Sequence, residues 1–331
     1  MRNLIGAARR PPLYLYALAG FATLIAIGAL VYVRYVAPPN GPCPGYGGPI
    51  LASPASPATD AASPVPAFSH VFTIVLENEE ATSVTGSASM PYLNGLAAQG
   101  AVLNQFYAIC HPSLPNYLAM VGGDTFGVHS NCTDCLVDGP NIVDGIEASG
   151  RTWKAYMEGA PRACFKGAGS GRYAQKHNPF IYFKSIRDDP ARCARVVPFT
   201  EFATDLASGT LPDYAWITPD LCHDGHDCSR AESDRWLSSV VPGILASAAF
   251  REGGVLVITY DEGTSDAGCC AVAAGGRIAT IVLSPLARAG TVDSNAYTHY
   301  SLLATVARAW GFVPPGRAAG VAPLTGFWTE P

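Results

Sequence analysis

Two pairs of polar residues, each with at least one acidic side chain, stand at the ends of apolar runs that lie far apart in the sequence. We call them the acidic pairs. One pair is Glu77-Asn78 and the other is Asp261-Glu262. Runs that are apolar at every position are typical of strands buried on both faces of a parallel sheet. Because ligands bind beyond the carboxyl ends of such strands, we expect these four side chains to converge at one sheet edge. Their oxygens suit a divalent metal ion, and calcium, iron, zinc and magnesium all remain open.

Ser113 lies between the two acidic pairs, two residues after His111 and two before Pro115. Proline is favoured in a first helical turn, which predicts a helix over 115–121 that begins close to Ser113. The hydroxyl would either cap this helix or act as a nucleophile, because the positive helix end stabilises an alkoxide and a bound phosphate. A nearby cation would activate the hydroxyl further. We therefore treat Ser113 and His111 as candidates for metal-assisted phosphoryl transfer.

A glycine-rich stretch over 167–171 leads into a basic segment that contains Arg172, Lys176 and His177. This segment would clamp a phosphate or a substrate head group, or it would be a flexible loop with ordinary surface charges. The sequence lacks the P-loop spacing Gly-x4-Gly-Lys-Ser/Thr and the Gly-x-Ser-x-Gly elbow of esterases. We keep the three basic side chains as candidate substrate-binding residues.

Two further histidines are candidates for proton transfer. His223 lies in the segment 220–227, which holds two histidines and three aspartates and would otherwise be a polar surface turn. His299 precedes a predicted helix over 300–310, where a lone histidine is usually structural. A histidine beside a leaving group can protonate it, so we retain both as candidate catalytic residues.

The first 67 of the 331 residues do not have the composition of a globular domain. Residues 13–33 are almost wholly apolar and, at about 1.5 Å per residue, are long enough to cross a bilayer core. Three arginines precede them and one follows closely, which predicts a signal-anchor within 1–36 and an extracytoplasmic remainder. A cleaved signal peptide, giving a secreted protein, is the alternative. Residues 37–67 are rich in proline, alanine and serine and predict a flexible linker.

Residues 68–331 alternate between apolar runs and helical patterns. Strands are predicted at 71–76, 101–107, 152–157, 214–218, 255–260 and 278–283, and helices at 90–99, 115–121, 142–149, 229–248 and 300–310. This alternation predicts a three-layer α/β/α sandwich with a mostly parallel sheet. The net charge of −5 without a long basic run disfavours nucleic acid as a partner. We expect a monomer.

Ten cysteines suit an oxidising compartment. Nine lie in the predicted domain, so at least one is unpaired there or reaches Cys43. A zinc site at the Cys132-x-x-Cys135 spacing is the alternative to a local disulfide, but no second pair follows at finger spacing. The pairs that sequence distance favours are Cys132 with Cys135, Cys222 with Cys228, and Cys164 with Cys193.

From about Ser69 onward, the chain resembles the bacterial acid phosphatase and phospholipase C phosphoesterase family, which has an alkaline-phosphatase-like fold. The resemblance rests on the strings Leu76-Glu77-Asn78, His111-Pro-Ser113-x-Pro-Asn-Tyr117, Tyr173-x-x-Lys176-His177, His223-Asp224-Gly225, Tyr260-Asp261-Glu262 and His299-Tyr300. It is similar above all to secreted acid phosphatases, some of them described as phosphatidylinositol-3-phosphate phosphatases. Where some relatives have Asp-Asp, this chain has Asp261-Glu262.

The resemblance implies a metal ion held by Glu77, Asn78, Ser113, Asp261 and Glu262. It implies phosphate binding or acid–base roles for His111, His223, His299, Lys176 and His177. The expected enzyme is a phosphomonoesterase that forms a seryl-phosphate and acts on a phosphorylated small molecule or a phospholipid head group, phosphoinositides included. A phospholipase C-like phosphodiesterase and a catalytically inactive surface-binding domain are the alternatives.

Overall fold

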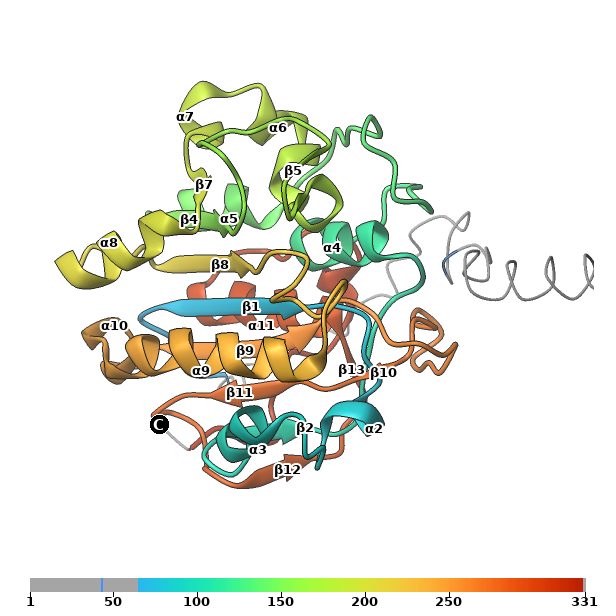
Figure 1. The fold of residues 1–331 in the computed structure, drawn as a ribbon, viewed down its shortest axis with the longest axis vertical. Helices are drawn as coiled ribbons and strands as arrows, with labels where there is room; N and C mark the ends of the chain where they lie inside the picture. Colours follow the sequence, from blue (N-terminus) through green and yellow to red (C-terminus); the bar gives the residue numbers. More distant parts are fainter. Residues whose placement is uncertain (1–42, 44–64, 330–331) are drawn as a thin grey trace, which may run out of the picture. The chain divides into compact units, whose positions relative to one another are not determined.

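The computed structural model describes residue 43 and residues 65–329, and an eight-stranded sheet forms its centre (Figure 1). The strands of this sheet are β1 (Val71–Leu76), β2 (Ala101–Leu103), β4 (Trp153–Met157), β7 (Val196–Pro198), β8 (Tyr214–Thr218), β9 (Val255–Tyr260), β11 (Ile281–Leu283) and β12 (Thr291–Asp293). Their order is β12-β2-β11-β9-β1-β8-β4-β7. The strands from β9 to β7 in this order are parallel, whereas β11 is antiparallel to both neighbours. The predicted, mostly parallel sheet is confirmed.

Helices cover both faces of the sheet, as the alternating sequence pattern predicts. In Figure 1, α9 crosses in front of the strands and α11 lies behind them. The helix α3 packs against α9, while α4 and α5 pack against α11. The helices are α2 (Ala81–Val84), α3 (Pro91–Ala97), α4 (Ser113–Gly122), α5 (Ile142–Ala148), α6 (Lys184–Arg187), α7 (Pro190–Cys193), α8 (Thr200–Ser208), α9 (Arg230–Ala246), α10 (Ala248–Arg251) and α11 (His299–Trp310), with short 3₁₀ turns at Gln175–His177, Pro179–Tyr182 and Gly316–Gly320.

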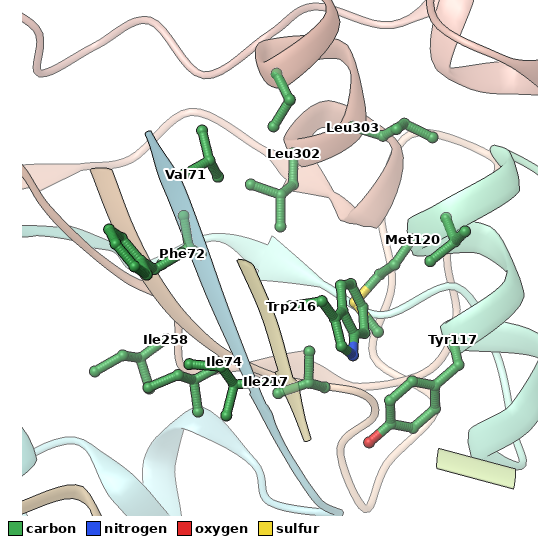
Figure 2. Close-up of a cluster of buried hydrophobic side chains, with 14 of the residues drawn as sticks. Val71, Phe72, Ile74, Tyr117, Met120, Trp216, Ile217, Ile258, Leu302 and Leu303 are labelled. Atoms are coloured by element: carbon green, nitrogen blue, oxygen red, sulfur yellow. The ribbon is translucent and has the colours of Figure 1, made fainter. Parts of the chain in front are cut away.

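The core is apolar where the central strands meet the helices. Every residue of β1 and β9 is buried, which explains why neither strand alternates polar and apolar residues. Figure 2 shows Leu302 and Leu303 of α11 and Met120 of α4 next to side chains of the central strands. Removing such side chains from water stabilises the sheet by about 25 cal/mol for each Å² of apolar surface. The strands whose ends carry the acidic pairs are therefore held in a packed apolar core.

Two predicted strands are each divided in the structure. The stretch predicted over 101–107 forms β2 in the large sheet and β3 (Phe106–Tyr107) in a second, three-stranded sheet with β10 (Arg277–Ile278) and β13 (Tyr297–Thr298). The strand predicted over 278–283 is divided in the same way, into β10 and β11. The two segments pass from one sheet to the other side by side, because β3 pairs with β10 and β2 pairs with β11. A further short hairpin joins β5 (Gly169–Ser170) to β6 (Tyr173–Ala174).

All ten cysteines are paired in disulfides. The three pairs favoured by sequence distance form, and Cys43 pairs with Cys110, whereas the zinc alternative does not apply. The remaining pair joins the neighbours Cys269 and Cys270. Within residue 43 and residues 65–329, none of the helices has the length and apolar character needed to cross a bilayer. The predicted membrane segment at 13–33 lies outside the described residues.

Candidate active site

The parallel pairing of β1 with β9 brings the two acidic pairs together. Leu76 is in register with Tyr260, and the Asp261 amide donates to the Leu76 carbonyl at 2.9 Å. Glu77 and Glu262, the acidic residues that follow, are both buried. The convergence predicted from the two apolar runs is therefore confirmed.

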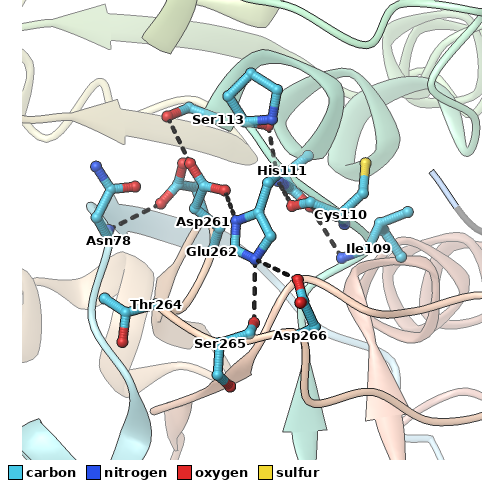
Figure 3. A network of polar contacts seen from close by, with 12 residues as sticks. Asn78, Ile109, Cys110, His111, Ser113, Asp261, Glu262, Thr264, Ser265 and Asp266 are labelled. Atoms are coloured by element: carbon cyan, nitrogen blue, oxygen red, sulfur yellow. Dashed lines mark hydrogen bonds and ion pairs between the residues drawn. The ribbon is translucent and has the colours of Figure 1, made fainter. Parts of the chain in front are cut away.

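Ser113 lies between these two carboxylates. Its Oγ is within hydrogen-bond distance of Glu77 Oε2, at 3.2 Å, and of Glu262 Oε1, at 3.1 Å. Figure 3 shows Ser113 beside Glu262. Ser113 is the first residue of α4, whose cap residue is Pro112, and the Leu114 amide in the first turn donates to Asn131 Oδ1 at 3.0 Å. Helix capping by Ser113 is thus not its role in this structure. The buried hydroxyl points at two carboxylates, beside the positive end of a helix.

Asn78 and Asp261 complete the predicted ligand set. The backbone amide of Asn78 donates to Asp261 Oδ1 at 3.1 Å. The other carboxylate oxygen, Asp261 Oδ2, and the side-chain oxygen of Asn78 are buried and have no hydrogen-bond partner among the described residues. Asn78 has a φ of 55°, in the left-handed region that asparagine tolerates better than most residues. Two buried oxygens without partners are costly unless a further group binds them.

His111 orients Glu262 rather than Ser113. Its Nδ1 contacts Glu262 Oε2, and its Nε2 donates to the Ser265 carbonyl at 3.0 Å. Burial lowers the pKa of His111, but the hydrogen bond and the charge of Glu262 outweigh it, so the net pKa is raised. Nδ1 therefore holds Glu262 through Oε2, the oxygen that Ser113 does not contact, while Nε2 anchors the ring to the loop at Ser265.

His177 joins Glu77 to a carboxylate that the candidate set omitted. Its Nδ1 lies 3.1 Å from Asp224 Oδ2 and its Nε2 lies 3.2 Å from Glu77 Oε2. Burial lowers the pKa of His177, but Glu77 and Asp224 raise it more, to about 9. Burial in turn raises the pKa of Asp224 to about 6. These three residues also form a group whose ligand atoms lie within 4.8 Å of one another, as a metal ion would require.

The remaining basic and histidine candidates occupy neighbouring positions. Lys176 Nζ donates to His226 Nε2 at 2.9 Å, and His226 Nδ1 lies 2.7 Å from Asp227 Oδ1. The Arg172 side chain is exposed, and only its carbonyl holds the adjacent loop, by accepting from the amide of Leu221 at 3.0 Å. Lys176 is thus hydrogen-bonded to the segment 220–227, while the Arg172 side chain faces solvent.

His223 belongs to a second cluster. Its Nδ1 lies 2.9 Å from Glu158 Oε2 and 3.5 Å from Asp220 Oδ1, and the three side chains are partly exposed. Glu158 was not predicted, since it follows β4 in a stretch without any motif. With Nδ1 held by carboxylates, Nε2 of His223 is left for exchange of a proton.

His299 is fully buried under the end of β9. Its Nε2 donates to the Asp261 carbonyl at 2.6 Å, and its Nδ1 has no hydrogen-bond partner among the described residues. Burial lowers the pKa of His299 to about 4. The ring is therefore neutral near pH 7 and holds the backbone at the acidic pair.

Among the described residues, the buried carboxylates of the site outnumber the buried histidines beside them. Four buried carboxylates meet there, those of Glu77, Asp224, Asp261 and Glu262. Burial raises the pKa of Asp261 well above its usual range, and the charges of Glu77 and Glu262 add to the increase. Carboxylates taken out of water need a paired cation. Together with the two unpartnered oxygens, this fits a bound divalent ion.

The phosphoesterase family model matches residues 77–313, which include the whole of this site. The chain belongs to the phosphoesterase family. This phosphoesterase is 33% identical over 273 residues to a phosphatidylinositol-3-phosphatase from Mycobacterium tuberculosis, with 82% of this chain and 86% of that protein covered. It is also 33% identical over 268 residues to a probable acid phosphatase from Kluyveromyces lactis, covering 77% of this chain but 61% of the yeast protein.

The fold of the phosphoesterase also matches solved structures. A protein of the alkaline phosphatase superfamily from Vibrio parahaemolyticus aligns with a TM-score of 0.52 at 15% identity, covering 78% of this chain and 70% of that one. At this identity the likeness shows the fold alone. The predicted alkaline-phosphatase-like architecture is confirmed.

Proposed function

We propose that this chain is a metal-dependent phosphomonoesterase that works through a phosphorylated Ser113. The observation that carries the proposal is the position of Ser113 Oγ, 3.2 Å from Glu77 Oε2 and 3.1 Å from Glu262 Oε1 at the start of α4. Family membership and the names of both relatives support hydrolysis of a phosphate ester.

The residues that would hold the ion are Glu77, Asn78, Ser113, Asp261 and Glu262. Their oxygens include the two that are buried without partners, and hard cations prefer such donors. When bound, a divalent ion supplies charge that stabilises the phosphate oxygens and the serine alkoxide.

The chain's own groups perform the proton transfers. Ser113 Oγ transfers its proton to Glu262 as it attacks phosphorus, the new Oγ–P bond forms, and the bond from phosphorus to the leaving oxygen breaks. His223, held at Nδ1 by Glu158, donates a proton to the departing alcohol. Water then attacks the seryl-phosphate and gives one proton to His223, the Oγ–P bond breaks, Ser113 Oγ takes back the proton that Glu262 held, and inorganic phosphate leaves.

The substrate that we propose is a phosphate monoester on a small polar molecule or a lipid head group. Lys176 and His177 contribute positive charge beside Glu77, which suits an anionic ester. The name of the mycobacterial relative supports a phosphoinositide. We further propose that the enzyme works outside the cytoplasm, since every cysteine is oxidised.

The test uses the full-length chain, purified in detergent, with an aryl phosphate as substrate. We expect release of phosphate that a chelator abolishes and a divalent metal restores. Ser113→Ala should lower kcat by at least about 10³-fold, while Ser149→Ala, which removes an exposed helix-end hydroxyl, should leave kcat unchanged. Undiminished turnover in Ser113→Ala would refute the mechanism.

A further inference from the structure

The backbone that leads into Ser113 is held by one buried side chain, that of Asn116 in α4. Asn116 Oδ1 accepts from the amides of Ile109 and Cys110 at 2.9 and 3.1 Å. Asn116 Nδ2 donates to the carbonyls of Cys110 and Pro112 at 2.6 and 3.2 Å. Both halves of the side-chain amide are used, so an isosteric residue with different polarity cannot reproduce the arrangement.

These bonds replace secondary structure that the segment lacks. Residues 108–112 belong to neither a helix nor a strand. Backbone bonds to residues 274–276 serve Ala108 and the Ile109 carbonyl, so the amides of Ile109 and Cys110 are paired by the Asn116 side chain instead. On the other side, Ala274 donates to the Ile109 carbonyl at 2.8 Å. The segment is therefore fixed between a loop and the Asn116 side chain, and Figure 3 shows Ile109, Cys110 and His111 next to Ser113.

The segment determines where two site residues lie. His111 contacts Glu262 on one side, and Ser113, at the end of the segment, donates to Glu262 on the other. A shift of residues 109–112 would move both groups relative to the carboxylate. A misplacement of about 1 Å at a reacting centre can lower a rate by about 10²-fold.

We propose that Asn116 is a positioning residue, which holds Ser113 and His111 in the geometry for attack on phosphorus. This inference rests on the proposed function. All four hydrogen bonds of the Asn116 side chain go to the backbone of Ile109, Cys110 and Pro112, and none goes to Glu77 or Glu262. Asn116 therefore acts on the site through the backbone.

A second asparagine offers a matched control. Asn94 also makes four hydrogen bonds from its side chain to the backbone: its Oδ1 accepts from Gly86, and its Nδ2 donates to the carbonyls of Val84, Ser87 and Met90. It lies in α3, and its side chain holds the α2–α3 connection rather than the segment that leads into Ser113. Replacing Asn94 removes a similar number of bonds without disturbing the approach to Ser113.

The experiment compares Asn116→Asp and Asn116→Ala with Asn94→Asp and Asn94→Ala in the full-length, metal-saturated enzyme. Asn116→Asp keeps the acceptor and the shape but loses both donated bonds. We expect its kcat for an aryl phosphate to fall by at least about tenfold, with KM changed less than about twofold. Both Asn94 variants should keep the wild-type kcat, even where their melting temperatures fall as far as those of the Asn116 variants.

Other outcomes overturn the inference in distinguishable ways. If both Asn116 variants keep the wild-type kcat, Asn116 does not position Ser113 and His111, and the proposed function is unaffected. An equal loss of kcat in the Asn94 variants shows a general effect of stability instead. If neither Asn116 variant folds while the Asn94 variants do, Asn116 is structural. A wild-type protein that releases no phosphate refutes the proposed function and this role with it.

Discussion

Replacing Asp261 with asparagine should change stability in opposite directions with and without metal. Asp261 is fully buried, its Oδ2 has no hydrogen-bond partner among the described residues, and Glu77 and Glu262 raise its pKa together with burial. Without a bound cation, the charged carboxylate therefore destabilises the folded protein. An asparagine at position 261 keeps an oxygen that can accept from the backbone amide of Asn78, and it removes the charge.

The two magnitudes can be set side by side. The pKa of Asp261 is raised by burial and by Glu77 and Glu262, and each unit of raised pKa costs the charged form about 1.4 kcal/mol. Asp261→Asn removes that charge and should stabilise the chelated protein by about 1–2 kcal/mol. For domains of about 150–250 residues this corresponds to roughly 2–4 °C per kcal/mol. With metal, the variant loses a charged ligand. If its affinity falls by about a hundredfold, the metal-dependent stabilisation shrinks by about 2.7 kcal/mol.

The assay is thermal unfolding of wild type and Asp261→Asn, each with excess chelator and with a series of divalent metal concentrations. We expect the variant to melt higher than wild type in chelator and lower at intermediate metal concentrations, where the wild-type site is filled. Asp293→Asn is the control, because Asp293 is buried but its side chain bonds Asn295, Tyr297 and Gly326 and none of the proposed metal ligands. A variant that melts lower than wild type in chelator, or that gains as much from metal as wild type does, would refute the reasoning.

Two further predictions follow from single histidines. His223→Gln should lower kcat for an alkyl phosphate by about 10²-fold or more and affect an aryl phosphate with a good leaving group much less; equal losses for the two substrates would exclude the proton-donor role. The pKa of His70 is lowered, first by burial, so the unfolded chain binds a proton more readily than the folded one as pH falls through about 6.5. Wild type should therefore lose stability below that pH, and His70→Gln should lose less between pH 7 and 5 in denaturant titrations; parallel losses would contradict this explanation.

The sequence was sufficient to place Glu77, Asp261 and their neighbours because of local rules. Each follows a strand that is apolar at every position, and adjacent parallel strands end at the same sheet edge. The position of Ser113 was harder to interpret, since a serine near Pro115 is compatible with a cap. Only the direction of its hydroxyl, toward Glu77 and Glu262, separates the two roles.

Asp224, which the sequence offered only as part of a motif, and Glu158 were not predicted as site residues for a physical reason. Asp224 lies in a loop whose position depends on a long-range bond, from the Glu77 amide to the Asp224 carbonyl at 2.9 Å, and no periodicity signals such a contact. Glu158 becomes relevant only because β4 pairs with β8 and brings it to His223. Pairings of this kind depend on the whole sheet, whereas the acidic strand ends depend on short segments.

The disulfide between Cys43 and Cys110 has a topological consequence. It closes a covalent ring that contains all residues from 43 to 110. A protease that cuts the chain once within 44–64 would therefore leave both fragments joined, and the N-terminal segment would stay attached to the body that carries Ser113. Release of that body requires a cut before Cys43 or a reductant in addition to the protease, a difference that gels run with and without thiol would reveal.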